Sequence, residues 1–167
     1  MTVSRRNKRA KRYGKEAERA IARLLDGQRV TETGRHDGKR DITTPYNLCV
    51  DVKSRKSLSP VPFEMLAQAA EKDLDVLTDA QGLVVCSILD LREFALGVQP
   101  GAWWAGYKST KRIPGTIVNW LDNVSTVAEP DELSCVILHR KGTRYTASVV
   151  VARLENFRTW LKQWRTE

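Results

Sequence analysis

The chain has 167 residues, with 28 Lys and Arg against 20 Asp and Glu, so its formal net charge is +8. This length accommodates one domain with a hydrophobic core, and the charge favours a polyanionic partner, either nucleic acid or an anionic membrane surface. The two histidines, His36 and His139, are both expected at the surface, and their small number argues against a histidine-based nuclease or a zinc hydrolase. Three cysteines stand far apart in apolar runs, and the sequence has no membrane-span pattern and no signal-peptide pattern. We therefore expect buried thiols and a cytoplasmic protein, in the host cytoplasm if it is phage-encoded; the cysteines are Cys49, Cys86 and Cys135.

The first residues of the chain are strongly basic. Between Thr2 and Lys15 there are seven basic residues and no acidic one. Such a segment repels itself and has little apolar surface to bury, which predicts a flexible basic arm over residues 1–13, disordered without a partner. We interpret the arm as a clamp on DNA phosphates, with a solvated tail as the alternative. Its candidate contacts to DNA are Arg5, Arg6, Lys8, Arg9, Lys11 and Arg12.

A helix is predicted from Gly14 to Asp26, because apolar residues recur there at helical spacing and Gly27 supplies a stop signal. Glu18 falls at the edge of the buried stripe, where an acid is unexpected. It is either a favourable carboxylate near a helix N-terminus or one member of a convergent acidic site.

Two short strands are predicted next, over residues 40–43 and 48–53. Pro45 suits the first central position of a type I turn, and Asn47 tolerates the left-handed conformation that closes a three-residue hairpin loop. A two-residue loop would reverse the faces on which the side chains of the two strands meet.

The three-residue loop sets Asp41 opposite Asp51, on the face that also carries Lys53. Two facing carboxylates repel one another unless a cation or a shared proton lies between them. Magnesium prefers oxygen ligands, makes hydroxide available from water near neutral pH, and offsets the charge that builds on a phosphodiester under attack. Asp41, Asp51 and the backbone carbonyl of Val52 are candidate ligands for Mg²⁺, or for Mn²⁺ in its place, and Glu18 could serve a second metal. Lys53 could position or deprotonate the attacking water, or neutralise the transition state.

The rest of the chain predicts a helix over residues 63–78, a strand over 82–89 that is apolar on both faces, a hairpin formed by 133–139 and 145–151 with a basic tip, and a final helix. The pattern is weak from 90 to 127, where the large apolar side chains must be buried or form a surface for a partner: Trp103, Trp104, Ile113 and Trp120. The final helix has one apolar face, formed by Phe157, Trp160, Leu161 and Trp164.

Three segments carry a resemblance to a known family: GKEAE at 14–18, KRDI at 39–42 and DVKSRK at 51–56. They resemble the PD-(D/E)XK nucleases, and most closely the archaeal-type Holliday junction resolvases. The resemblance covers residues 14–90; Arg40 stands where the family usually has Pro, and Asp51 stands where resolvases more often have Glu. It implies that Glu18, Asp41 and Asp51 bind the metal and that Lys53 is the catalytic lysine. It also implies that Arg55 and Lys56 contact the DNA backbone. Gln68 is a weaker match to a helix glutamine of the family.

We therefore expect an α/β fold, with a restriction-endonuclease-like mixed β-sheet flanked by helices. Residues 14–90 would form the nuclease core, and 91–167 an extension packed on the same domain. The expected function is structure-selective hydrolysis of phosphodiesters in branched DNA by a homodimer, since symmetric junction cleavage needs two sites. The alternatives are a nuclease of this type with another DNA target, and a non-catalytic DNA-binding protein of the same fold. A non-functional alternative for the acids is an ordinary strand pair whose charged side chains face solvent. The loop before the first strand adds further candidate contacts to DNA, which are Arg35, Lys39 and Arg40.

Overall fold

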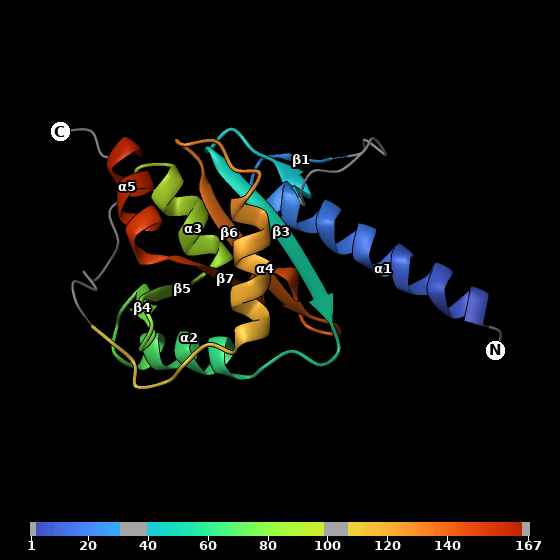
Figure 1. Ribbon diagram of the computed structural model, residues 1–167, viewed down its shortest axis with the longest axis horizontal. Helices are drawn as coiled ribbons and strands as arrows, with labels where there is room; N and C mark the ends of the chain where they lie inside the picture. Colours follow the sequence, from blue (N-terminus) through green and yellow to red (C-terminus); the bar gives the residue numbers. More distant parts are fainter. Residues whose placement is uncertain (1–2, 31–39, 99–106, 165–167) are drawn as a thin grey trace.

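The computed structural model describes residues 3–30, 40–98 and 107–164. Within them, a seven-stranded mixed β-sheet has the order β1-β2-β3-β6-β7-β5-β4 and carries helices on its two faces (Figure 1). The strands are β1 (Gln28–Arg29), β2 (Ile42–Thr43), β3 (Leu48–Arg55), β4 (Val76–Thr78), β5 (Leu83–Ser87), β6 (Leu133–Arg140) and β7 (Val149–Arg153). The helices are α1 (Val3–Leu24), α2 (Val61–Glu71), α3 (Ile88–Ala95), α4 (Gly115–Ser125) and α5 (Leu154–Trp164), with a short 3₁₀ helix, η1 (Tyr145–Ala147). The expected α/β architecture with a mixed sheet is confirmed.

The centre of the sheet joins the two halves of the chain. β3 and β6 pair in parallel along their whole length, from Leu48 opposite Leu133 to Arg55 opposite Arg140, and the other named strand pairs are antiparallel. The predicted C-terminal hairpin forms as β6 and β7, and both strands lie inside the sheet. The second half of the chain is therefore an integral part of the central sheet, because β6 is the direct neighbour of β3.

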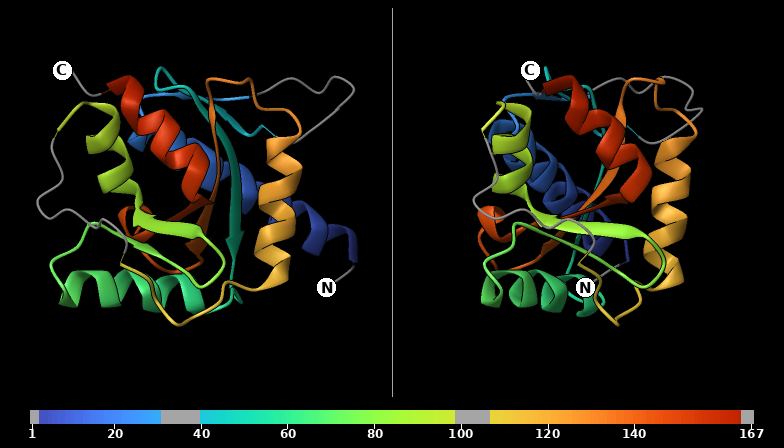
Figure 2. Two further views of the ribbon diagram at one scale, coloured as in Figure 1. Left: turned by 60° about the vertical axis from the view of Figure 1, so that its left-hand side comes forward. Right: turned by 90° about the vertical axis from the view of Figure 1, so that its left-hand side faces the viewer.

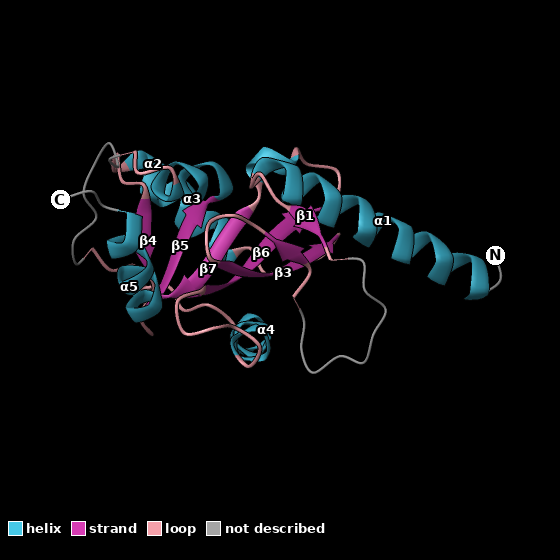
Figure 3. Ribbon diagram, turned by 90° about the horizontal axis from the view of Figure 1, so that it is seen from above, coloured by secondary structure: helices cyan, strands magenta, loops and turns pink. Residues whose placement is uncertain are grey.

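Alternation along β3 separates two hydrophobic cores. Val50 and Val52 pack with α1, α3 and α5, whereas Cys49 packs with α2 and α4 on the other face. Figure 3 shows α1 and α4 on opposite sides of the strands. A side chain on β3 therefore faces α1 if its residue number is even and α4 if it is odd.

Helix α1 begins at Val3, so the segment expected to be a disordered arm is helical. Lys, Arg and Ala are good helix formers, and no Gly or Pro interrupts the segment before Gly14. The first turns are exposed and reach past the strands (Figure 2). α1 ends at Leu24, two residues before the predicted end at Asp26, and the left-handed residue after it is Asp26 (φ 54°) rather than Gly27. A Cβ on Gly27 would meet the carbonyl oxygen of Thr43 at 2.2 Å, so only glycine lets the chain pass β2 so closely.

The helix expected over residues 63–78 is wrong in its second half. α2 ends at Glu71, Asp73 has a left-handed φ of 52°, and the amide of Leu74 donates to the carbonyl of Ala69 across the end of the helix. The apolar residues that follow form β4 instead. The strand expected over 82–89 ends at Ser87, whose hydroxyl accepts from the Asp90 amide and caps α3.

The final helix is confirmed as α5, and Phe157, Trp160 and Leu161 are buried as expected. All three cysteines are free and buried, also as expected. None of the described helices combines the length and the apolar character that crossing a membrane requires.

Candidate functional site

The β2–β3 hairpin has the predicted register. Ile42 is paired with Val50, and Asn47 adopts a left-handed φ of 51° in the loop. The three-residue loop is therefore confirmed, and Asp41 lies beside Asp51, whose side chain is on the face of the sheet that α4 covers.

The Asp41 carboxylate is held against β3 by the backbone. Its Oδ2 accepts a hydrogen bond from the Val52 amide at 2.8 Å, while its own amide donates to the Val50 carbonyl at 2.8 Å. Burial raises the pKa of Asp41 to about 7, and the neighbouring Asp51 and, more weakly, Glu18 add to the rise against the opposing Val52 hydrogen bond. Asp41 thus holds its proton to a much higher pH than an ordinary aspartate does.

Asp51 is buried, with 2 % of its side chain exposed. Its Oδ2 lies 3.1 Å from the Lys53 ammonium but has no partner of hydrogen-bonding geometry among the described residues. An unsatisfied buried carboxylate oxygen beside a second carboxylate is costly. The Val52 amide points toward Asp41. The amide and the carbonyl of one residue in a strand point to the same side, so the Val52 carbonyl also lies on the side of Asp41. Two carboxylates and a carbonyl match the oxygen ligands that Mg²⁺ or Mn²⁺ prefers.

Lys53 lies between the acidic pair and an aromatic ring. Its ammonium is 5.4 Å from the centre of the Trp120 ring on α4, and the Arg55 guanidinium lies 5.0 Å from the same ring. Trp120 is half-buried beside the buried stripe of α4. Sequence reasoning named it only as a core or partner-surface residue, because nothing within α4 indicates that β3 packs beneath it.

Glu18 does not join the acidic pair. Its carboxylate accepts from the Arg29 guanidinium, and Arg29 pairs with Ile42, so both face α1 on the opposite side of the sheet from Asp51. The described residues contain no group of three or more His, Cys, Asp or Glu side chains arranged to hold a metal ion. The structure therefore brings together three of the four predicted catalytic residues, and Glu18 reaches them only through its effect on the pKa of Asp41.

Two other predicted site residues have structural partners. Arg40 donates to both carboxylate oxygens of Glu132, at 2.6 Å for the Nη1 contact, and to the Val127 carbonyl at 3.3 Å, so it ties the start of β2 to the loop before β6. Gln68 accepts from the Ser109 hydroxyl at 3.3 Å on α2, which packs on β4, β5 and β7. Neither side chain is therefore placed with the acidic pair. The motif did not indicate these partners, because they are distant in sequence.

The other candidate contacts to DNA are exposed where the structure describes them. The six basic residues of the expected arm project from the first turns of α1, and Arg55 and Lys56 lie at the exposed end of β3. The remaining predicted residues lie outside the described residues: Arg35, His36, Lys39, Trp103 and Trp104.

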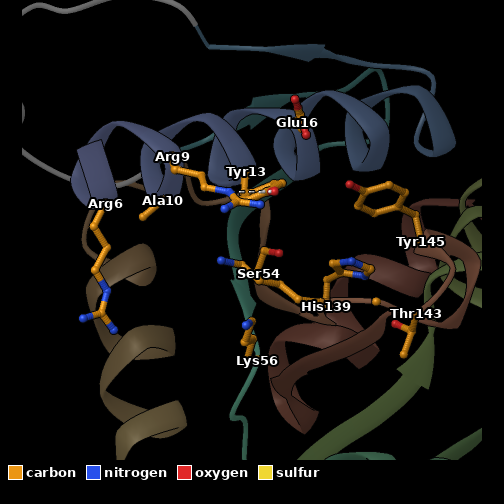
Figure 4. A pocket seen from close by; sticks show the side chains of 12 residues that line it. Arg6, Arg9, Ala10, Tyr13, Glu16, Ser54, Lys56, His139, Thr143 and Tyr145 are labelled. Carbon is orange, nitrogen blue, oxygen red and sulfur yellow. Dashed lines mark hydrogen bonds between the residues drawn. The ribbon is translucent and has the colours of Figure 1, made fainter. Parts of the chain in front are cut away.

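A cleft of about 720 Å³ lies on the α1 face, away from Asp41, Asp51 and Lys53 (Figure 4). His139 lines it and is buried, 3 % exposed, rather than lying at the surface as expected. Tertiary contacts bury this side chain. The centre of its ring lies 4.3 Å from the centre of the Tyr145 ring, on which it stacks, and its Nδ1 lies 3.3 Å from the Ser148 hydroxyl. The cleft is lined by Arg6, Arg9, Ala10, Tyr13, Glu16, Ser54, Lys56, His139, Lys141, Gly142, Thr143 and Tyr145.

Comparisons with protein-family models, with curated proteins and with solved structures give no match.

Proposed function

We propose that this protein is a metal-dependent DNA endonuclease of the PD-(D/E)XK type. The observation that supports it most is the pair formed by Asp41 and Asp51. The pKa of Asp41 is raised to about 7, and the buried Oδ2 of Asp51 is ion-paired with Lys53 but accepts no hydrogen bond from the described residues. Perturbed, under-satisfied carboxylates beside a lysine are typical of functional sites rather than of solvent-facing charge. The mixed sheet flanked by helices is compatible with a restriction-endonuclease-like fold.

Asp41, Asp51 and the Val52 carbonyl would hold Mg²⁺ or Mn²⁺. When bound, the metal supplies Lewis-acid stabilisation of phosphodiester hydrolysis and a more acidic water. The Val52 amide fixes the position of the Asp41 carboxylate, so this ligand does not have to be ordered when the cation arrives. Lys53, with Trp120 on one side and Asp51 on the other, presents a cation to the phosphate or takes part in proton transfer.

The substrate proposed is branched DNA, cut by a homodimer in the cytoplasm. The ordered resemblance of residues 14–90 to Holliday junction resolvases supports the junction, and the formal charge of +8 supports a polyanion. Exposed cations on the first turns of α1 and at the end of β3 offer further contacts to DNA phosphates.

The test is cleavage of labelled four-way junction, flap and linear duplex by the wild type and by Asp51→Asn, with magnesium or EDTA. Asp131→Asn, an exposed acid before β6, is the matched control. We expect symmetric, magnesium-dependent nicking of the junction that is lost only in Asp51→Asn. Equal cutting of all three substrates would reduce the proposal to a general nuclease.

Metal binding is measured separately by thermal unfolding. A metal that binds only the folded state stabilises it by about 2.7 kcal/mol at one hundred times its dissociation constant. We expect magnesium or manganese to raise the melting temperature of the wild type and of Asp131→Asn, and to leave Asp51→Asn unchanged. Equal shifts in all three proteins would place the metal elsewhere.

A second candidate, a DNA-binding protein without catalysis, is favoured by one observation. Glu18 is paired with Arg29 on the other face of the sheet, which leaves two convergent acids where the resemblance implies three. Binding of the junction without cleavage in magnesium or manganese would establish this candidate in place of the endonuclease.

A further inference from the structure

The cleft on the α1 face has a rim of positive charge. Arg6 and Arg9 reach it from α1, while Lys56 follows β3 and Lys141 follows β6 (Figure 4). Glu16 is the one acid among the lining residues, and its carboxylate is paired with Arg12 at 3.0 Å. The rim therefore has a net positive charge suited to a phosphate group.

The interior of the cleft is aromatic. Tyr13 is 39 % exposed; its hydroxyl accepts from Arg9 at 3.1 Å, and the Lys141 ammonium lies 5.1 Å from its ring centre. Tyr145 and His139 form a stacked pair, with ring centres 4.3 Å apart and an interplanar angle of 25°. Aromatic rings beside cations are the combination that proteins use for the bases and phosphates of single strands.

The cleft also presents polar groups with hydrogen-bonding capacity that the described residues leave unused. His139 is 3 % exposed, and only its Nδ1 has a hydrogen-bond partner, Ser148, among the described residues. Burial lowers the pKa of His139, so the ring is neutral at physiological pH and offers Nε2 to a neutral heterocycle rather than a charge to a phosphate. Ser54 lies directly beside His139 across the β3–β6 pair and adds a hydroxyl.

A base paired within a duplex cannot reach this interior, because its ring faces are stacked and its Watson–Crick edge is occupied. An unpaired base can. The volume of about 720 Å³ lies within the range of roughly 300–1,000 Å³ typical of pockets for small ligands, which suits one nucleotide.

We propose that the cleft binds one unpaired nucleotide of a DNA strand, with its phosphate on the cations of the rim and its base among Tyr13, Tyr145 and the edge formed by Ser54 and His139. The inference rests on the proposed function only for the identity of the strand as DNA. It deepens that function, because a branched or opened substrate offers unpaired nucleotides that a plain duplex lacks.

The test uses the full chain in EDTA, so that no strand is cut, and measures the fluorescence anisotropy of a labelled ten-nucleotide oligothymidine and of a labelled blunt hairpin duplex. The variant is Tyr13→Ala. Its matched control is Tyr107→Ala, because Tyr107 is 38 % exposed and also lies beside a lysine, Lys72, yet stands outside the cleft.

Stacking on an aromatic side chain contributes about 1–3 kcal/mol per base, so Tyr13→Ala should weaken oligothymidine binding by roughly fivefold to a hundredfold. Duplex binding should change by less than twofold, and Tyr107→Ala should change neither. The ring signals of His139 in a ¹⁵N spectrum should shift when oligothymidine is added and stay in place with the duplex.

Equal weakening of single-strand and duplex binding, or unmoved His139 signals, would overturn the inference and leave the cleft as part of a general basic surface. These readouts are separate from catalysis. Selective single-strand binding in a protein that never cuts DNA with magnesium would remove the endonuclease and keep the cleft, whereas cutting without an effect of Tyr13→Ala would do the reverse.

Discussion

The Val52 amide donates a hydrogen bond to the Asp41 carboxylate at 2.8 Å, so the acid that precedes β2 is fixed to the strand that carries Asp51 and Lys53. This contact lowers the pKa of Asp41, while burial and the nearby Asp51 raise it more strongly, to about 7. Two acids are thus held together with the Lys53 ammonium beside Asp51, and the raised pKa of Asp41 should be measurable in protein stability.

Stability should fall as pH rises toward 7 because of Asp41. Its pKa is about 7 in the folded protein against an ordinary value of 3.8, so between these values the folded state binds more protons than the unfolded state. Asp41→Asn removes this penalty. The free energy of unfolding of the variant minus that of the wild type should therefore be larger at pH 8 than at pH 5, by roughly 1–3 kcal/mol. Urea unfolding in EDTA measures it. An identical difference at both pH values would contradict the raised pKa, and Asp131→Asn serves as the flat control.

Glu18 should matter less to cleavage than either acid of the pair, because Arg29 holds its carboxylate on the other face of the sheet. We expect Glu18→Gln to reduce the turnover of junction DNA by less than about tenfold, and Asp51→Asn to reduce it by more than about a hundredfold, a difference in barrier of more than ~1.4 kcal/mol. If Glu18→Gln is as inactive as Asp51→Asn while it remains folded, Glu18 acts directly in catalysis and its pairing with Arg29 is exchanged when DNA binds.

Trp120 should act as a positioning residue for Lys53. Cation–π contacts contribute about 0.5–2 kcal/mol, so Trp120→Leu should lower kcat on saturating junction DNA by roughly twofold to thirtyfold. Trp120→Phe keeps an aromatic face and should recover most of that loss. A purely structural role predicts instead that kcat follows the melting temperature in both variants, so equal kcat values for the Leu and Phe variants would argue against positioning.

Substitutions of Arg40 and of Lys11 should distinguish a cation that stabilises the fold from one that binds DNA. Arg40→Ala leaves the half-buried Glu132 without its partner and should cost roughly 1–3 kcal/mol of unfolding free energy, with no change in the salt dependence of DNA affinity. Lys11 is exposed on α1, so Lys11→Ala should leave stability unchanged and reduce the slope of log affinity against log salt by about one. A reduced salt slope in Arg40→Ala would return that residue to the DNA-binding surface.

The errors in the predicted elements have identifiable causes. Helical spacing continued through Leu74 and Leu77, but the left-handed Asp73 ends α2, and Leu77 is buried on β4 instead. Leu74 and Leu77 are three residues apart, as in a helix, and the three residues of β4 are too few for their own alternation to stand out against that spacing. The sequence predicts His139 at the surface, but its ring stacks on Tyr145 in η1, a helix that the pattern did not indicate.

The sequence by itself determined the β2–β3 hairpin and, with it, the pairing of Asp41 with Asp51. The turn residues, the loop length and the alternation of side chains all lie within about a dozen residues, and the register of a hairpin follows from such local geometry. It also determined the buried cysteines and the apolar face of α5, since burial follows from side-chain chemistry and spacing.

Only the tertiary structure decided which face each distant residue occupies. α1 covers the side of the sheet opposite Asp51, so Glu18 pairs with Arg29 instead of completing the acidic site. Likewise Arg40 meets Glu132, and α4 brings Trp120 over Lys53. These contacts join segments separated by many residues, and their formation depends on the packing of whole helices against the sheet, which no local pattern of the chain specifies.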